Sequence, residues 1–183
     1  VERDPPASGW SVNRRHLLFD FGGPMLLTPF ELREQGAAGL GVDITQLSGG
    51  PFDPGDERWA ARVRGEITER EYWAGEAARF GRDIAGYMHH FYEPSGNHLV
   101  RPESEALLDE MQAEGRIVGM LTNDLTAFHG VEWQAPIRVL PKFAPRVDLS
   151  TTGHLKPHPR GYETANEAMG VDASQIVFTD DHV

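Results

Sequence analysis

The chain has 183 residues, of which 39% are hydrophobic and 25% charged, and its formal net charge is −11. This composition predicts a cytoplasmic globular protein with one core and room for an inserted subdomain. The acidic balance disfavours nucleic acid and anionic membranes as partners, and no apolar run approaches the roughly 20 residues that span a bilayer. Because the chain lacks cysteine, disulfides, thiol catalysis and cysteine-bound zinc are excluded.

The first expected structural element follows a polar, proline-containing stretch. Residues 1–11 are expected to form a disordered tail outside the fold. The apolar run Leu17–Phe19 then stops at Asp20 and a loop rich in glycine. A short apolar run bounded by glycine and proline is typical of a parallel strand that is buried on both faces. We therefore predict a strand that places Asp20 at its carboxyl end.

Residues 28–97 show helical patterns and no strand pattern, which predicts a helical insert. The expected helices are Glu31–Ala38, Arg58–Arg64 and Thr68–Phe80. The last begins with a capping-box pattern in which Thr68 precedes Glu71 by three residues. The aromatic residues of the insert are expected to form its core and not a platform for substrate; they are Trp59, Tyr72, Trp73 and Tyr87. The segments Gly49–Gly55 and Pro94–Gly96 are rich in glycine and proline and are predicted to be hinges.

After the insert, helices and strands alternate. The predicted helices are Pro102–Glu114 and Pro159–Met169, and the predicted strands are Arg116–Leu121 and Gln175–Phe178. Such alternation predicts an α/β fold, a Rossmann-like three-layer core around a parallel sheet. The core would be discontinuous, formed by residues 12–27 and 98–183, with residues 28–97 as an inserted helical cap.

Polar residues follow each predicted strand, at the edge where parallel sheets bind their ligands. They are Asp20, Thr122, Asp180 and Asp181, and Lys156 lies in a loop as one of only two lysines. An aspartate with an ordinary pKa of about 3.9 is ionised at neutral pH and can attack phosphorus. Carboxylate oxygens are suitable ligands for Mg²⁺, and a lysine and a hydroxyl stabilise a phosphoryl group. This set predicts magnesium-dependent phosphoryl chemistry through an aspartyl-phosphate.

Four segments, in this order, resemble the motifs of the haloacid dehalogenase superfamily of aspartate-nucleophile hydrolases. They are Leu17–Gly23, Met120–Asn123, Gly153–Pro157 and Val177–Asp181. The resemblance covers nearly all the chain, and the helical insert is similar to that family's small cap. It implies Asp20 as nucleophile, Thr122, Asn123 and Lys156 as phosphate-binding residues, and Mg²⁺ held by Asp20, the backbone carbonyl of Gly22, Asp180 and Asp181. Response-regulator receivers use similar groups, but there the acidic pair comes first and no long insert occurs.

One position departs from the pattern of the family's phosphatases. They usually carry a second aspartate two residues after the nucleophile as general acid and base, where this chain has Gly22. Loss of a general acid lowers the rate by about 10² to 10⁴. The loss is smallest for phosphates with good leaving groups, such as acyl phosphates or anomeric sugar phosphates. We expect a phosphatase for a small phosphorylated metabolite. A carbon–halogen hydrolase, which also lacks this aspartate, and a catalytically weakened binding or regulatory protein stay as alternatives.

Two further features give no catalytic assignment. Six of the eight histidines suggest a metal site only at first sight, because they show no compact ligand spacing; they are His89, His90, His129, His154, His158 and His182. Val183 directly follows the fourth motif, before the helix and strand that normally complete such a sheet. This predicts either a truncated chain or a longer natural one. Neither the substrate nor the oligomeric state follows from the sequence.

Overall fold

The computed structural model describes residues 15–181, so the predicted tail and His182 lie outside the described residues. Its strands form one four-stranded sheet in the order β3-β2-β1-β4, and all paired strands are parallel. The strands are β1 His16–Phe19, β2 Val118–Thr122, β3 Arg146–Asp148 and β4 Ile176–Thr179. The predicted parallel α/β fold is therefore confirmed, with β1 between β2 and β4.

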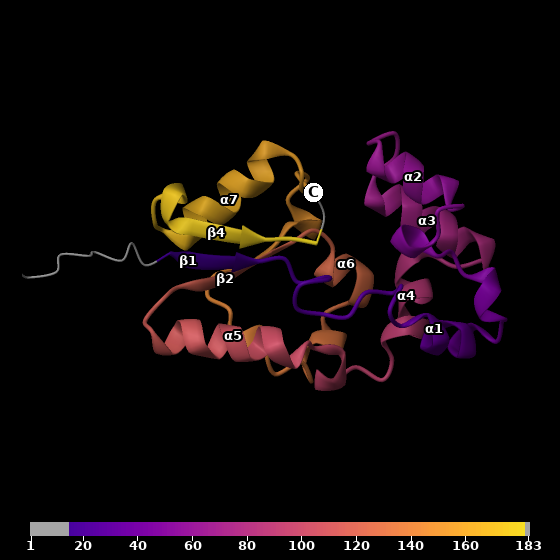
Figure 1. Ribbon diagram of the computed structural model, residues 1–183, viewed down its shortest axis with the longest axis horizontal. Coiled ribbons are helices and arrows are strands. Elements are labelled where there is room, and N and C mark those ends of the chain that lie inside the picture. The colour runs from indigo at the N-terminus through magenta and orange to yellow at the C-terminus, as the bar shows by residue number, and fades with distance from the viewer. Residues whose placement is uncertain (1–14, 182–183) are drawn as a thin grey trace, which may run out of the picture.

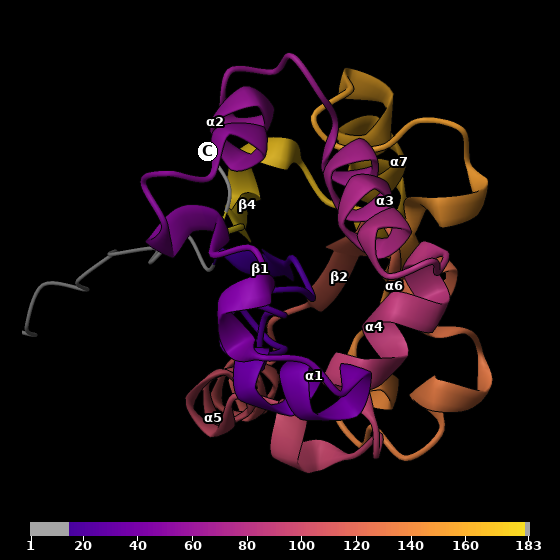
Figure 2. The ribbon, with the colours of Figure 1, turned by 90° about the vertical axis from the view of Figure 1, so that its right-hand side faces the viewer.

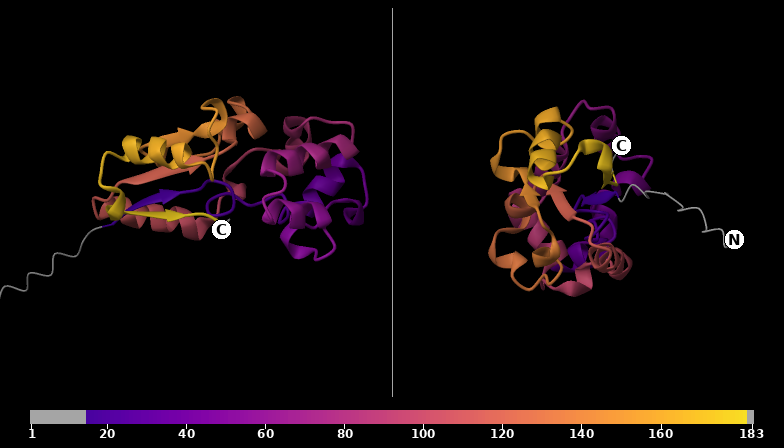
Figure 3. Two further views of the ribbon diagram at one scale, coloured as in Figure 1. Left: turned by 90° about the horizontal axis from the view of Figure 1, so that it is seen from above. Right: turned by 90° about the vertical axis from the view of Figure 1, so that its left-hand side faces the viewer.

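Helices cover both faces of the sheet and extend beyond one end of it. They are α1 Arg33–Leu40, α2 Glu57–Val63, α3 Glu69–Arg79, α4 Ile84–Tyr92, α5 Pro102–Ala113, α6 Leu125–His129 and α7 Pro159–Met169. Figure 1 shows α7 on one face of the sheet and α5 on the other, which gives three layers. Helices α1 to α4, called the helical unit below, lie beyond the carboxyl ends of the strands, as the view from above in Figure 3 also shows.

The central strands β1 and β2 contribute side chains to apolar clusters on both faces of the sheet, since successive side chains of a strand point in opposite directions. In β1, Leu18 packs with Met169 of α7, whereas Phe19 belongs to the cluster on the α5 side with Leu108. All five residues of β2 are buried. This arrangement explains why the strands appear in the sequence as short apolar runs without alternating polar residues.

The helical unit has its own aromatic core, continuous with the cluster on the α5 side of the sheet. Tyr72, Trp73 and Tyr87 are buried as predicted, and Trp59 packs against them. The predicted capping box at the start of α3 is confirmed. The Glu71 amide donates to the Thr68 hydroxyl at 3.1 Å, and the Thr68 amide donates to the Glu71 carboxylate at 2.7 Å.

The two connections between the helical unit and the sheet run side by side. The Leu27 amide donates to the carbonyl of Leu99 at 2.9 Å, and the Arg101 amide donates to the carbonyl of Met25 at 2.9 Å. The prediction of a hinge at Gly49–Gly55 is therefore wrong. This segment lies within the helical unit, and a Cβ added to Gly50 would meet the Phe30 ring at 2.1 Å. Within residues 15–181, no helix is long and apolar enough to cross a bilayer.

Candidate active site

The sheet brings three of the predicted site residues to one edge. Asp20 directly follows β1, Thr122 is the last residue of β2, and Asp180 directly follows β4. The Asp20 amide donates to the carbonyl of Thr179 at 2.8 Å, which continues the β1–β4 pairing up to the predicted nucleophile. Figure 2 looks from the helical unit onto this edge.

Lys156 joins two of these carboxylates from the loop before α7. Its Nζ lies 2.9 Å from Oδ2 of Asp20 and 2.7 Å from Oδ2 of Asp180. The other oxygen of Asp20, Oδ1, accepts the amide of Phe21 at 2.7 Å. The Lys156 side chain is 8% exposed and those of Asp20 and Asp180 are 11% and 13% exposed. In such a place the ammonium is screened little by water and acts strongly on both carboxylates.

Burial changes the acidity of the predicted nucleophile from the value expected for an aspartate. Burial raises the pKa of Asp20 to about 7, the Lys156 ammonium opposes this shift, and the Asp180 carboxylate adds to it. Burial also disfavours the charged form of Lys156, but the two carboxylates outweigh it and raise the pKa of that amine. One ammonium therefore does not fully compensate the carboxylates, and further positive charge at this point would ionise Asp20.

Asp181 completes a group of three carboxylates that fits a divalent cation. Oxygens of Asp20, Asp180 and Asp181 lie within 4.8 Å of one another. Carboxylate oxygens are the ligands that Mg²⁺ selects, and Mg²⁺ keeps water in its remaining positions. Asp181 is exposed and Asp180 half-buried, so water has access to this side of the group. The donor set therefore suits a hard divalent cation such as Mg²⁺.

Gly23 is the residue that leaves room for Asp181. Its φ is +75°, and a Cβ at this position would lie 2.2 Å from Cγ of Asp181 and 2.3 Å from one of its oxygens. Arg101 holds the same turn, since its Nε donates to the Gly23 carbonyl at 2.6 Å. The glycine therefore serves two needs, a left-handed backbone and the close approach of a carboxylate.

We expect the Gly23→Ala substitution to weaken Mg²⁺ binding about tenfold or more, because Asp181 must move away from the new methyl group. The matched control is Gly115→Ala, since Gly115 also has a φ of +75° but open space around a Cβ. Both variants should lose about 1 kcal/mol of stability from backbone strain. Titration calorimetry with Mg²⁺ measures the difference. Equal Mg²⁺ affinity in the two variants would show that Asp181 does not hold the metal.

Asn123 positions the lysine loop through its side-chain amide. Its Oδ1 accepts the amide of Lys156 at 2.7 Å, and its Nδ2 donates to the carbonyl of Lys156 at 3.1 Å. These bonds explain how a loop residue reaches the strand ends. A phosphate-binding role for Asn123 stays a prediction, and so does that of Thr122, which is 6% exposed.

A contact between the helical unit and the predicted phosphate-binding loop was missed by sequence reasoning. Arg70, in the first turn of α3, forms an ion pair with Asp124, whose side chain is 8% exposed. Asp124 lies two residues after Thr122. In the sequence, Arg70 stands within a capping box and Asp124 within a turn-forming triplet, and nothing in either pattern indicates that the two side chains meet.

The comparisons with known proteins agree with this geometry. A model of the haloacid dehalogenase-like hydrolase family matches residues 16–183. The chain therefore belongs to the haloacid dehalogenase-like hydrolases. No curated protein is significantly similar to it in sequence.

Solved structures with similar folds include both chemistries considered above. The L-2-haloacid dehalogenase RSc1362 has a TM-score of 0.60 at 18% identity, over 90% of this chain and 76% of that one. A β-phosphoglucomutase from Clostridium difficile has a TM-score of 0.54 at 12% identity, over 91% and 76%. A HAD phosphatase from Thermococcus onnurineus has a TM-score of 0.51 at 18% identity, over 90% and 75%. At these identities the similarity shows the fold alone.

Proposed function

We propose that this hydrolase is a magnesium-dependent phosphatase of a small phosphorylated metabolite that acts through an aspartyl-phosphate. The observation that carries the proposal is the buried Lys156 ammonium between Asp20 and Asp180, with Asp181 completing a group of oxygen ligands within 4.8 Å. A carboxylate nucleophile, a cation and a metal-ligand group at one point are what phosphoryl transfer requires.

In the first step, a carboxylate oxygen of Asp20 attacks phosphorus. The new bond joins this oxygen to phosphorus, and the bond from phosphorus to the leaving oxygen breaks, with its electron pair going to that oxygen. The Lys156 ammonium offsets the negative charge of the carboxylates of Asp20 and Asp180. The hydroxyl of Thr122 donates to a phosphoryl oxygen. Since Gly22 carries no acid, the leaving oxygen takes its proton from water.

In the second step, water attacks phosphorus of the aspartyl-phosphate, the bond to the Asp20 oxygen breaks, and phosphate leaves. Asp20, Asp180, Asp181 and the backbone carbonyl of Gly22 would hold Mg²⁺. When bound, the ion supplies positive charge that favours the ionised nucleophile and the phosphoryl oxygens. Because burial raises the pKa of Asp20 to about 7, such positive charge would lower this pKa and keep the nucleophile ionised.

We assign the helical insert, residues 28–97, the role of a cap over this site. Helix α3 contacts the loop after β2 through the ion pair of Arg70 with Asp124, and the paired connections at Leu27 and Leu99 join the insert to the sheet. A cap that excludes water would strengthen electrostatic interactions at the strand ends. It would also select the organic part of the substrate.

A carbon–halogen hydrolase is the second candidate, favoured by the absence of an acid at Gly22. Displacement of halide needs neither a proton for the leaving group nor a metal. The three clustered carboxylates support the phosphatase instead, because a metal-independent enzyme has no use for Asp181 beside Asp180 and Asp20. A third candidate, a catalytically weakened protein that binds phosphorylated ligands, also follows from Gly22.

A panel of phosphomonoesters and 2-haloacids, assayed with and without Mg²⁺, separates the three candidates. The phosphatase proposal predicts Mg²⁺-dependent release of phosphate, fastest from acyl and anomeric phosphates. Release of halide without Mg²⁺ would identify a dehalogenase. Tight binding of a phosphate analogue without turnover of any compound would identify the weakened protein.

We expect Gly22→Asp to raise turnover of alkyl phosphates, which have poor leaving groups, by about 10²-fold, because the new carboxyl can protonate the leaving oxygen. Gly22 is exposed, and nothing lies within 4 Å of a Cβ built there, so the side chain fits. The control is Gly22→Asn, which has the same size without an acid. The slope of log kcat against leaving-group pKa should flatten only in Gly22→Asp. An unchanged slope would contradict the assigned role of position 22.

A further inference from the structure

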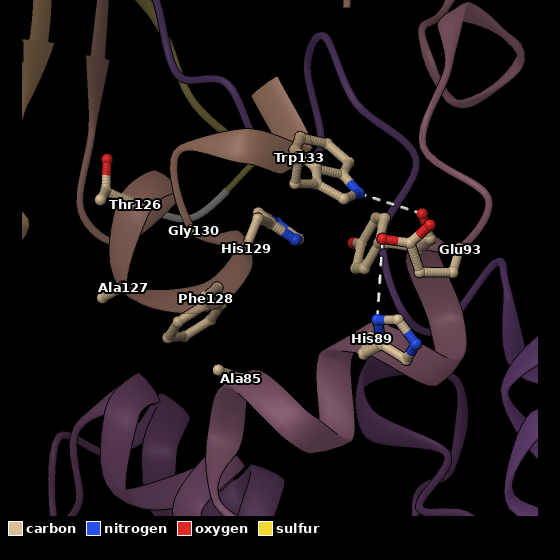
Figure 4. A pocket seen from close by; sticks show the side chains of 10 residues that line it. Ala85, His89, Glu93, Thr126, Ala127, Phe128, His129, Gly130 and Trp133 are labelled. Carbon is tan, nitrogen blue, oxygen red and sulfur yellow. Dashed lines mark hydrogen bonds and ion pairs between the residues drawn. The ribbon is translucent and has the colours of Figure 1, made fainter. Parts of the chain in front are cut away.

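A cavity lies between the helical unit and the sheet, apart from the carboxylate site. It has a volume of about 200 Å³ and runs between α4 and α6. Ala85, His89 and Glu93 line it from the α4 side, and Phe128 and His129 from α6. Figure 4 shows these side chains around the space between the two helices. Neither Asp20 nor any other predicted site residue lines it.

Half of the residues that line this α4–α6 cavity carry aromatic or imidazole rings. The rings of His129 and Trp133 are stacked with centroids 4.2 Å apart, and Tyr92 meets His129 edge to face at 4.6 Å. The polar atoms of two of these rings are already used. Trp133 donates its indole N–H to the carbonyl of Tyr92 at 3.0 Å, and the Tyr92 hydroxyl donates to the carbonyl of Leu27 at 2.8 Å. These two residues therefore offer ring surface, which attracts aromatic groups and cations.

The one carboxylate that lines the α4–α6 cavity, among residues 15–181, is that of Glu93, which is half-buried. No lysine or arginine of this part of the chain lines it, and the basic side chains there are the imidazoles of His89 and His129. Oε1 of Glu93 lies 3.6 Å from Nδ1 of His89, and Oε2 accepts the amide of Ser95 at 3.1 Å. An anionic ligand such as a phosphate would therefore have no lysine or arginine to pair with in this cavity. A cationic ligand could pair with the Glu93 carboxylate and contact the neighbouring aromatic rings.

His129 adds a neutral polar group to the wall. Burial lowers the pKa of His129 to about 3, so its ring is uncharged at neutral pH and carries one donor and one acceptor. The ring therefore offers a ligand polar atoms without adding charge to the wall of the cavity.

We propose that the α4–α6 cavity binds a small organic cation that carries one aromatic ring and an ammonium group. The ring would lie among Tyr92, Phe128 and Trp133, and the ammonium would pair with Glu93. The size agrees, because a cavity of about 150 Å³ holds benzene and the larger volume here leaves room for a short charged arm. Since α4 and α6 form opposite walls, the bound cation would bridge the helical unit and the sheet.

Calorimetric titration of the unmodified protein with benzylammonium, benzyl alcohol and phenylacetate tests the chemistry of the ligand. We expect benzylammonium to bind at least about tenfold more tightly than the alcohol, and phenylacetate not to bind. In a nitrogen-labelled sample, benzylammonium should shift the indole N–H resonance of Trp133. Equal affinity for the three compounds, absence of binding by benzylammonium, or an unmoved Trp133 resonance would overturn the proposal.

The Glu93→Gln substitution tests the position of the charge. The amide keeps an acceptor for the Ser95 amide but removes the negative charge, so benzylammonium should bind about tenfold more weakly and benzyl alcohol equally well. The matched control is Glu132→Gln, which removes an exposed carboxylate next to Trp133 that does not line the cavity. The same loss in both variants would show that only general charge matters, and would contradict the proposal.

Discussion

The Asp20→Asn variant is expected to lose phosphatase turnover by about 10⁴-fold or more, because a neutral amide oxygen does not attack phosphorus. An asparagine oxygen would still accept the Phe21 amide that Oδ1 accepts at 2.7 Å, and Lys156 would keep its contact with Asp180 at 2.7 Å. The loss therefore reports on the nucleophile and not on collapse of the site. Initial rates on an acyl phosphate at saturating Mg²⁺ measure it.

The control for this loss is Asp109→Asn, which removes an exposed carboxylate on α5 that pairs with Lys142. It should retain the activity of the unmodified protein. The Asp20→Asn protein should also still bind a phosphate analogue, since Lys156 remains. Turnover by Asp20→Asn within about tenfold of the unmodified protein would exclude Asp20 as the covalent nucleophile.

The Lys156→Met variant is expected to lose about 10³-fold in turnover and about 3 kcal/mol of stability near pH 8. The side chain of Lys156 is 8% exposed and compensates both Asp20 and Asp180, so its removal leaves buried carboxylates without a cation. Methionine has a similar length and keeps the apolar contacts of the lysine stem. Urea unfolding in the presence of a chelator measures the stability of the metal-free protein.

The stability loss in Lys156→Met should depend on pH in a definite direction. Burial raises the pKa of Asp20 to about 7 in the folded protein, above the unfolded value of about 3.9. The folded state therefore retains a proton that the unfolded state has lost, and the contribution of Asp20 to stability falls as the pH rises from about 4 to about 7. A protonated Asp20 needs less compensation, so the cost of losing Lys156 should be smaller near pH 5 than near pH 8.

The chain provides a matched control in Lys142, its one other lysine. Lys142 pairs at the surface with Glu105 and Asp109 at 2.9 Å and 2.7 Å. Lys142→Met should cost less than about 1 kcal/mol, as exposed pairs do, and equally at both pH values. A cost of Lys156→Met that is the same at pH 5 and pH 8 would contradict the assigned coupling between Lys156 and Asp20.

The elements that sequence patterns predicted are those whose burial is complete or periodic. β1 and β2 appear as uninterrupted apolar runs, and the bounds predicted for α7 agree with the structure. The elements that were missed lack such patterns. β3 has three residues, Arg146–Asp148, and α6 has five, which is too short for a period to be recognised. α4 is the exception, because Tyr87, Met88, Phe91 and Tyr92 form a buried face at helical spacing while Ala85 and His89 are exposed, and this periodic pattern was overlooked.

The sequence predicted those site residues whose positions are determined by the order and direction of the strands alone. Asp20, Thr122 and Asp180 come together because parallel strands end at one edge. The position of Lys156 depends on the side-chain amide of Asn123 holding its loop, and the pKa of Asp20 depends on burial by residues distant in sequence. Such tertiary contacts do not follow from local patterns, and the same holds for the ion pair of Arg70 with Asp124.

An aspartyl-phosphate mechanism requires that a phosphoryl group is covalently attached to Asp20 during turnover. Acid quenching during steady-state hydrolysis of an acyl phosphate, followed by mass spectrometry of the peptides, tests it most directly. The peptide containing Asp20 should gain the mass of one phosphoryl group, in a Mg²⁺-dependent amount, and the Asp20→Asn protein should gain none. A phosphoryl group on another residue, or rapid turnover with unmodified Asp20 peptide throughout, would exclude Asp20 as the covalent nucleophile.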